Sequence, residues 1–135
     1  MGTKATLTQE LVVTGKDEMG ALAHTTLPLK QGNINVECFC CYSMEGQARF
    51  HLVTNNNKKA KELLTKNGWT VTENSAVLWQ TDNIPGTLNK ATSALSEART
   101  NIEYCYFASP PGARTSGVVF HTTNDTKACE ILGRL

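Results

Sequence analysis

The hydrophobic and polar positions of this chain fall into blocks that predict strands and helices in the same order twice. Stretches rich in Val, Leu and Trp that run into a glycine-containing loop predict buried strands at 9–15 and 75–81. Apolar runs separated by Gly, Pro and Ser turns predict two hairpins, 34–43 with 48–54 and 101–109 with 117–123. The remaining blocks predict helices at about 20–31, 57–67, 86–98 and 124–135.

Residues near the ends of these helices refine their expected limits. Pro85 stands where a helix begins, and its fixed φ suits the first turn. Pro28 lies inside the first helix, where it removes a backbone donor at a cost of about 3 kcal/mol, so a kink or an early helix end is expected there. Asn56 and Asn124 precede the other two helices and suit N-caps.

The order of elements repeats because the sequence repeats. Residues of the first half match residues 66 positions further on, and from residue 50 the offset becomes 68. The matches at the first offset are Gly20 with Gly86, Leu22 with Leu88, Leu29 with Leu95, Asn35 with Asn101 and Glu37 with Glu103. The change of offset falls in the turns SMEGQA and SPPGART, where a chain tolerates insertions. A constant offset over several matches predicts one unit duplicated.

Each copy is expected to follow the order β-α-β-β-α-β, the ferredoxin-like pattern. A final strand at 69–74 completes the first copy, so the copies span 1–74 and 75–135. The second copy reaches Leu135 with its last strand missing, so its sheet edge is open, or the segment 3–8 or a neighbouring chain covers it. The predicted fold class is α+β: two ferredoxin-like (βαββαβ) units with antiparallel sheets side by side and helices on one face.

Composition and charge narrow the function classes. Hydrophobic residues make up 40% and charged residues 19% of the chain, as in an ordinary globular domain. The 13 Lys and Arg against 12 Asp and Glu give a net charge of +1 without a basic stripe, which argues against nucleic acid as a partner. No apolar run approaches the roughly 18 residues of a membrane span, and the first ten residues lack the apolar segment of a signal peptide. We expect a cytoplasmic protein with no membrane partner.

Two short motifs recur at the same place in both copies. A glycine loop opens the first helix, and Asn-Val-Glu at 35–37 or Asn-Ile-Glu at 101–103 enters the second strand. With the βαββαβ order, these motifs resemble the ACT domain, a regulatory module that binds small molecules, often amino acids. Over residues 7–135, the tandem copies are similar to small stand-alone tandem ACT proteins. The resemblance implies a non-catalytic, allosteric regulator without a cofactor.

The resemblance also implies a ligand site at the loop that opens the first helix, where it approaches a neighbouring domain. Loop amides would hold a carboxylate, because free N–H groups at a helix start attract anions and glycine lets a ligand approach the backbone. The family's Asp/Asn-x-Pro-Gly loop matches Asn83, Ile84, Pro85 and Gly86 before Thr87, and less well Asp17, Glu18, Met19 and Gly20 before Ala21. The family's Asn at the second strand matches Asn35 and Asn101.

The first loop departs from this pattern. Met19 replaces the usual proline, and the acids Asp17 and Glu18 would hold an ammonium but repel a carboxylate. The loop at Asn83 is therefore the preferred carboxylate site. Alternatively, the glycines of both loops only build the turns, while Asp17 and Asn83 bond nearby backbone.

The cysteines raise a metal hypothesis. Cys38 and Cys40 share one strand face, so two thiolates would reach one soft ion, while Cys41 points the other way. No CxxC spacing supports such a site, and buried cysteines that pack as small apolar residues are commoner. The five cysteines fit a reducing compartment rather than a disulfide scaffold. No metal is expected.

No catalytic pattern can be assembled from the sequence. His51 and His121 lie in the third strand of each copy and are expected on the strand surface, without a Ser-His-Asp or Cys-His arrangement. Glu37 and Glu103 either form a polar corner for a ligand ammonium or are solvated strand-end carboxylates. Trp69 and Trp79 are expected as core or interface fillers. No enzyme is expected.

These predictions together describe a non-catalytic sensor. A sheet face that carries Cys, Phe, Val and Tyr suggests burial against a second chain, so a homodimer is expected. An amino acid bound between ACT domains would alter the affinity for a regulated partner protein. Two alternatives stay open: a structural protein–protein interaction module without a ligand, and a thiol or metal-binding protein.

Overall fold

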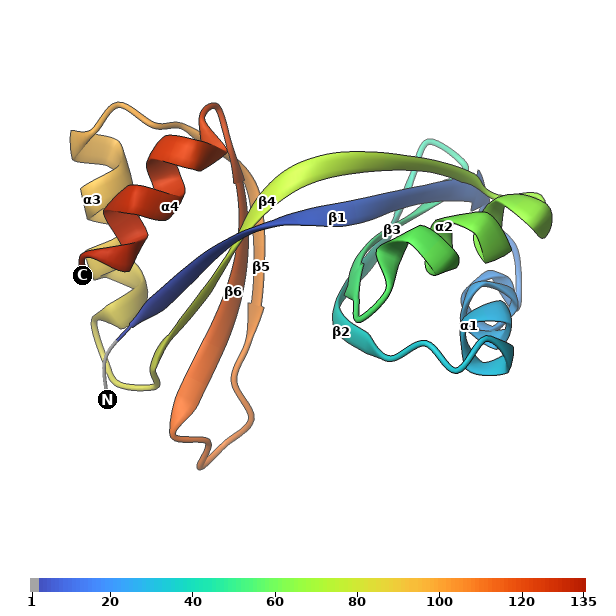
Figure 1. The fold of residues 1–135 in the computed structure, drawn as a ribbon, viewed down its shortest axis with the longest axis horizontal. Helices are drawn as coiled ribbons and strands as arrows, with labels where there is room; N and C mark the ends of the chain where they lie inside the picture. The colour runs from blue at the N-terminus through green and yellow to red at the C-terminus, as the bar shows by residue number, and fades with distance from the viewer. Residues whose placement is uncertain (1–2) are drawn as a thin grey trace. The chain divides into compact units, whose positions relative to one another are not determined.

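The computed structural model describes residues 3–135, which form an α+β fold (Figure 1). Its described strands make an antiparallel sheet in the order β2-β3-β1-β4-β6-β5. The strands are β1 Lys4–Lys16, β2 Val36–Met44, β3 Gln47–Thr54, β4 Thr70–Asp82, β5 Ile102–Ala108 and β6 Thr115–Thr122. The helices are α1 Ala21–Gln31, α2 Asn57–Lys66, α3 Thr87–Glu97 and α4 Asp125–Gly133.

The chain divides into two compact units, each with its own core. The first unit is Gln9–Asn74, and the second is Ser75–Leu135 together with the described residues up to Thr8. The strands β1 and β4 each contribute to both units. Residues 3–8, which the sequence division placed in the first copy, therefore group with the second unit.

Residues 3–8 lie at the sheet edge of the second unit, where the sequence left the final strand unassigned. The beginning of β1 neighbours β4, and Ala5 packs against the core of the second unit. A side chain added at Gly133 of α4 would meet the Ala5 Cβ at 3.8 Å. Of the alternatives left open by the sequence, the segment 3–8 is the one that lies at this edge.

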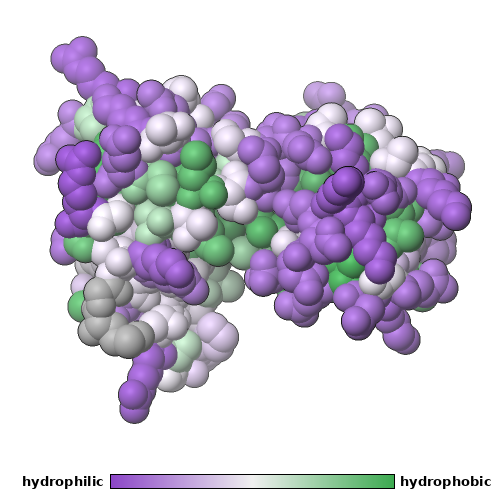
Figure 2. Space-filling view, in the orientation of Figure 1, coloured by the Kyte–Doolittle hydropathy of each residue, from purple (hydrophilic) through white to green (hydrophobic). Residues whose placement is uncertain are grey.

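The core of the first unit lies between its sheet and the helices α1 and α2. Residues of β1 and β3 pair as Leu11 with Leu52 and Val13 with Phe50, so their side chains share one face of the sheet. All four are fully buried and pack with Leu29 and Leu64 of the two helices. Figure 2 shows hydrophilic residues dominating the visible surface of this unit, with hydrophobic residues between them in small patches.

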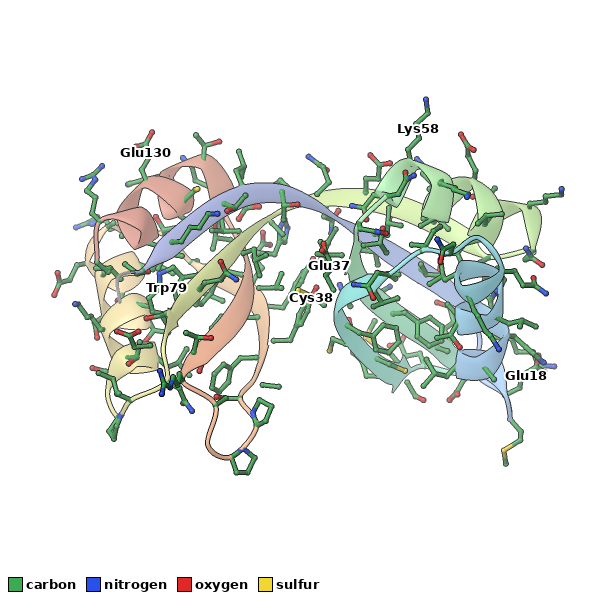
Figure 3. All side chains as sticks on the ribbon, turned by 60° about the horizontal axis from the view of Figure 1, so that its bottom comes forward. Glu18, Glu37, Cys38, Lys58, Trp79 and Glu130 are labelled. Carbon is green, nitrogen blue, oxygen red and sulfur yellow. The ribbon has the colours of Figure 1, made fainter. Side chains whose placement is uncertain are left out.

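The core of the second unit is built around Trp79 of β4. Trp79 is 1% exposed and lies 6.3 Å, centroid to centroid, from the Phe120 ring. Its indole Nε1 donates a hydrogen bond of 3.2 Å to the Leu132 carbonyl of α4. Figure 3 labels this side chain on the side of β4 that carries the helices. The prediction of Trp79 as a core filler is confirmed, and Trp69 packs half-buried against the first core.

Local capping chemistry sets the start of two helices. Asn56 Oδ1 accepts from the Lys59 amide and Asn124 Oδ1 from the Lys127 amide, both at 3.1 Å. These bonds satisfy helix N–H groups that have no partner within the helix, and they confirm both N-caps. Of the two outcomes expected at Pro28, a kink or an early helix end, the early end is wrong, because α1 continues to Gln31.

The expectation that His51 lies on the strand surface is also wrong. His51 is 3% exposed, and its Nδ1 lies 2.9 Å from Oε1 of Glu10, which is fully buried. Its Nε2 lies 2.8 Å from the Tyr42 hydroxyl, and the two rings stack. The pairing of His51 with Val12 and Cys40 places it on the sheet face opposite the core. A polar network therefore lies within the first unit, where the sequence pattern alone predicted a solvated position.

His121 is half-buried in the second unit. Its Nδ1 lies 3.0 Å from an Asp125 carboxylate oxygen and 2.7 Å from the Ser75 carbonyl, and its Nε2 lies 3.6 Å from Glu103. Glu103 is half-exposed on its side chain, as expected of a strand-end carboxylate. No helix among the described residues is long and apolar enough to cross a membrane.

Candidate functional site

The loop from Asn83 to Thr87 connects β4 to α3 in the second unit. Gly86 adopts φ 89°, a left-handed conformation that glycine reaches without steric cost, so the chain can turn directly into the helix. No side chain forms a capping hydrogen bond at the start of α3. The helices α2 and α4 differ from α3 in this respect, because an asparagine side chain caps the N-terminus of each. The Thr87 amide donates to the Ile84 carbonyl at 3.4 Å, and no side chain caps the amides that follow it in the first turn of α3.

The polar side chains of this loop bond away from the helix start. Asn83 Nδ2 donates to the Ala113 carbonyl at 2.8 Å, and the Asn83 amide donates to the Arg114 carbonyl at 2.9 Å. Thr87 Oγ1 donates to the Ile84 carbonyl at 2.9 Å. Asn83 therefore braces the loop against the β5–β6 turn, as the turn-building alternative expects.

A hollow of about 310 Å³, here called the polar hollow, lies on one side of this loop. It is lined by Thr3, Trp79, Thr81, Asp82, Ile84, Pro85, Gly86, Thr87, Lys90 and Leu135. Thr81 is 8% exposed, and the Thr3 hydroxyl is buried without a hydrogen-bond partner among the described residues. The hollow thus combines an open helix start, hydroxyl groups and the Lys90 ammonium.

A second hollow of about 240 Å³, here called the apolar hollow, also borders this loop. Its walls are mostly apolar, and Phe107 and Leu88 are 47% and 40% exposed. It is lined by Trp79, Thr81, Asp82, Asn83, Ile84, Gly86, Thr87, Leu88, Asn89, Phe107, Ser116 and Val118. Pockets with apolar walls and a few polar groups are the usual form of a small-molecule site.

The loop from Asp17 to Ala21 is the counterpart in the first unit. Gly20 adopts φ 83°, and the start of α1 also lacks a side-chain cap. The Asp17 amide donates to the Gly46 carbonyl at 3.2 Å, as Asn83 does to Arg114 in the second unit. Met19 is 98% exposed, and Glu18 lies 3.7 Å from the Lys16 ammonium in an exposed ion pair. Figure 3 labels Glu18 on this loop, ahead of α1.

The space beside the first loop is partly filled by an aromatic ring. A hollow of about 440 Å³ is lined by Gly15, Lys16, Glu18, His24, Leu27, Pro28, Gln31, Asn67, Gly68 and Trp69. The Trp69 ring packs so closely on Gly15 that a Cβ at this position would clash with it. Gly15 is the counterpart of Thr81 at the 66-residue offset. The two units therefore present different chemistry at equivalent positions.

The asparagines at the second strands lie apart from these loops. Asn35 is exposed, and its amide donates to Asn55 Oδ1 at 3.0 Å. Asn101 lines a separate hollow with Arg99 and Ile102 at the end of α3, and its amide donates to Thr123 Oγ1 at 3.1 Å. Within the second unit, Asn101 and Asn83 line different hollows.

Sequence reasoning missed Thr3, Thr81, Lys90 and Phe107 as site residues. No strong sequence signal marked them: their counterparts at the offset of 66 are Trp69, Gly15, His24 and Cys41, and many other positions differ in the same way.

The thiols do not gather into a metal centre. Among residues 3–135, no group of three or more His, Cys, Asp or Glu side chains is placed to hold a metal ion. Burial raises the pKa of the Cys38 thiol, and the carboxylates of Glu37 and Glu10 raise it further. Burial is also the main cause of the raised pKa of Cys40, Cys41 and Cys105. These thiols are therefore held in the protonated form, which is a poor metal ligand and a poor nucleophile.

We expect slow alkylation of Cys38 and Cys40 by iodoacetamide in the native protein at pH 8. A raised pKa leaves less thiolate at a given pH than in the unfolded chain, and the deficit shrinks as the pH rises through the native pKa. Mass spectrometry of timed samples measures the rate, with the urea-unfolded protein as the reference. Native rates equal to or above the unfolded rates would contradict these shifts.

No sequence-family model and no curated protein sequence matches the chain. Solved structures do match it. Protein BT0572 from Bacteroides thetaiotaomicron has a TM-score of 0.88 at 25% identity, over 96% of this chain and 89% of that chain. The ligand-free regulatory subunit of aspartate kinase from Thermus thermophilus has a TM-score of 0.72 at 15% identity, over 99% and 97% of the two chains.

A third similar structure is E. coli aspartokinase III in complex with lysine and aspartate. Its TM-score is 0.61 at 12% identity, over 98% of this chain and 31% of the longer aspartokinase chain. Regulatory subunits of aspartate kinase are ACT-domain proteins, so these likenesses show that the chain has an ACT-type fold. At identities this low, the likeness to the kinases concerns the fold alone.

Proposed function

We propose that this protein is a non-catalytic regulator built from two ferredoxin-like ACT units, which binds an amino acid or a similar small molecule. The observation that carries the proposal is the uncapped start of α3, which opens between two hollows, while asparagines close the starts of α2 and α4. Open amides at a helix start attract a carboxylate, and Gly86 lets it approach. The ACT-type fold shared with aspartate kinase regulatory subunits supports this use.

The loop from Asn83 to Thr87 is the proposed carboxylate site. At the loop from Asp17 to Ala21, the acids Asp17 and Glu18 stand where a carboxylate would lie, so this loop is the weaker site. The aspartokinase structure with lysine and aspartate supports an amino acid as the ligand.

We also propose that the protein works as a homodimer in the cytoplasm. Asn35 and Asn101 are exposed, and neither lines a hollow beside the loop of its own unit. They would complete a ligand site when a loop meets a neighbouring ACT unit, as the family resemblance implies. A ligand bound there would favour one arrangement of the neighbours and change the affinity for a regulated partner protein.

A thermal-shift screen with the common amino acids tests this function. At a ligand concentration of about 100 times the dissociation constant, binding is expected to stabilise the protein by about 2.7 kcal/mol. No shift with any amino acid at millimolar concentration would favour the alternative, a structural interaction module without a ligand.

The variant Asn83→Ala tests the site within the same screen. This substitution removes the hydrogen bond from Asn83 Nδ2 to the Ala113 carbonyl, which holds the loop in place. Ligand binding is therefore expected to weaken while the protein stays folded. Asp17→Ala is the matched control, because Asp17 holds the equivalent position in the first loop. Unchanged affinity in Asn83→Ala, or an equal loss in the control, would reject the assignment.

A further inference from the structure

The polar hollow and the apolar hollow are two sides of one site. Both are lined by Trp79, Thr81, Asp82, Ile84, Gly86 and Thr87, so they adjoin each other around the loop that opens α3. The lining of the polar hollow is polar and apolar in about equal parts, whereas that of the apolar hollow is mostly apolar. A molecule bound at the loop would therefore contact two different surfaces. The chemistry of these surfaces determines which class of molecule binds.

The polar hollow contains one buried hydroxyl group without a hydrogen-bond partner among the described residues. The Thr3 Oγ1 atom is buried and forms no hydrogen bond with any described residue. Thr81, which is 92% buried, places a second hydroxyl group in the lining of the same hollow. An unsatisfied buried hydroxyl is costly, so such groups normally have a partner. This observation does not depend on the helix start, and it indicates a missing acceptor.

A carboxylate fits the polar hollow as that acceptor. Its two oxygens offer enough lone pairs for both threonine hydroxyls, while the Lys90 ammonium and the open start of α3 supply positive charge. Asp82 lines both hollows and provides the opposite charge for an ammonium between them. The polar groups thus match the carboxylate and the ammonium of an α-amino acid.

The apolar hollow then receives the side chain of that amino acid. Leu88, Phe107 and Val118 face this space, and Asp82 is its only ionisable residue among those that line it. Leu88 and Phe107 leave much of their apolar surface exposed, and a ligand side chain would cover part of it. A glutamate side chain would lose hydration without a cationic partner there, and a lysine side chain would compete with the ligand's own ammonium for Asp82.

We propose that the second unit selects an α-amino acid with an uncharged aliphatic side chain, of the leucine or methionine class. The proposal rests on the proposed function and names the ligand class of that same site. It also predicts one strong site per chain, because in the first unit Gly15 and Trp69 replace the hydroxyls of Thr81 and Thr3.

Calorimetric titration of the full chain with leucine, methionine, glycine, lysine and glutamate tests the selection. Leucine or methionine is expected to bind at least about ten times more tightly than glycine, because each buried CH₂ adds to the affinity, and lysine and glutamate are expected to bind most weakly. The expected stoichiometry is one ligand per chain. Tighter binding of lysine or glutamate would overturn the proposed selection while leaving the amino-acid regulator intact. No binding of any amino acid would overturn both.

Two variants separate the roles of the hollows. Thr81→Val removes a hydroxyl at nearly constant shape, and it is expected to weaken leucine and glycine binding by a similar factor, about tenfold. Phe107→Ala is expected to reduce the preference for leucine over glycine by at least about threefold. Cys41→Ala, at the counterpart of Phe107 in the first unit, is the control and should change neither. Unchanged leucine affinity in Thr81→Val, or an unchanged preference in Phe107→Ala, would reject the proposed binding mode.

Discussion

Replacing Glu10 with alanine is expected to lower the free energy of unfolding by about 3 to 5 kcal/mol, the usual cost of removing one partner of a buried ionisable pair. Glu10 is fully buried, and its Oε1 lies 2.9 Å from Nδ1 of His51, which is 3% exposed. Without the carboxylate, the imidazole loses a short hydrogen bond in a position that water does not reach freely. Urea unfolding, with the midpoint and slope compared against the unmodified protein, measures the change.

The double variant Glu10→Leu, His51→Leu provides the sharper comparison. Replacing a buried polar pair by apolar residues of similar volume is often neutral or stabilising, so the double variant should recover much of the stability lost in Glu10→Ala. Glu62→Ala, an exposed position of α2, should stay within about 0.5 kcal/mol of the unmodified protein. Equal stabilities of Glu10→Ala and Glu62→Ala would contradict the importance of the pair.

Replacing Trp79 with alanine is expected to cost about 3 to 5 kcal/mol, as is usual when a large buried aromatic side chain is deleted. Trp79 is among the largest fully buried side chains, packs near Phe120, and holds α4 through its bond to the Leu132 carbonyl. The same side chain lines both hollows of the candidate site, so the loss of packing should also weaken ligand binding. Urea unfolding and calorimetry of the same preparation measure the two effects.

Trp79→Phe distinguishes packing from the hydrogen bond. Phenylalanine keeps a ring in the core but removes the Nε1 donor, so a smaller loss than in Trp79→Ala is expected. Met19→Ala is the surface control, because Met19 is almost fully exposed, and its effect should be within about 0.5 kcal/mol. A loss in Trp79→Ala no greater than this control would show that the second core does not depend on the indole.

Features that depend on neighbouring residues were predictable from the sequence. Asn56 and Asn124 cap their helices because a short side chain reaches an amide three residues ahead, whatever the rest of the fold does. The glycines at 20 and 86 mark the turns into α1 and α3 because the left-handed conformation costs glycine little. The loop positions of the candidate site follow from the same local chemistry.

Features that depend on distant strands were beyond such reasoning. Histidine is polar, so the local sequence around His51 gives no sign that it is buried. Its burial depends on the pairing of β3 with β1, which places Glu10, 41 positions away in the chain, next to it. Thr3 and Thr81 line one hollow only because residues 3–8 group with Ser75–Leu135. Threonine is common in strands, so neither residue attracts notice by its local pattern.

The sequence by itself determined the order of strands and helices and the glycine turns before α1 and α3, since periodicity, caps and turn conformations are set within a few residues. Only the tertiary structure decided that residues 3–8 complete the second unit, that Glu10 and His51 are buried together, and that one loop lies between a polar and an apolar hollow. These features follow from strand pairing and packing between residues far apart in the chain. The local propensities of the residues do not predict such contacts.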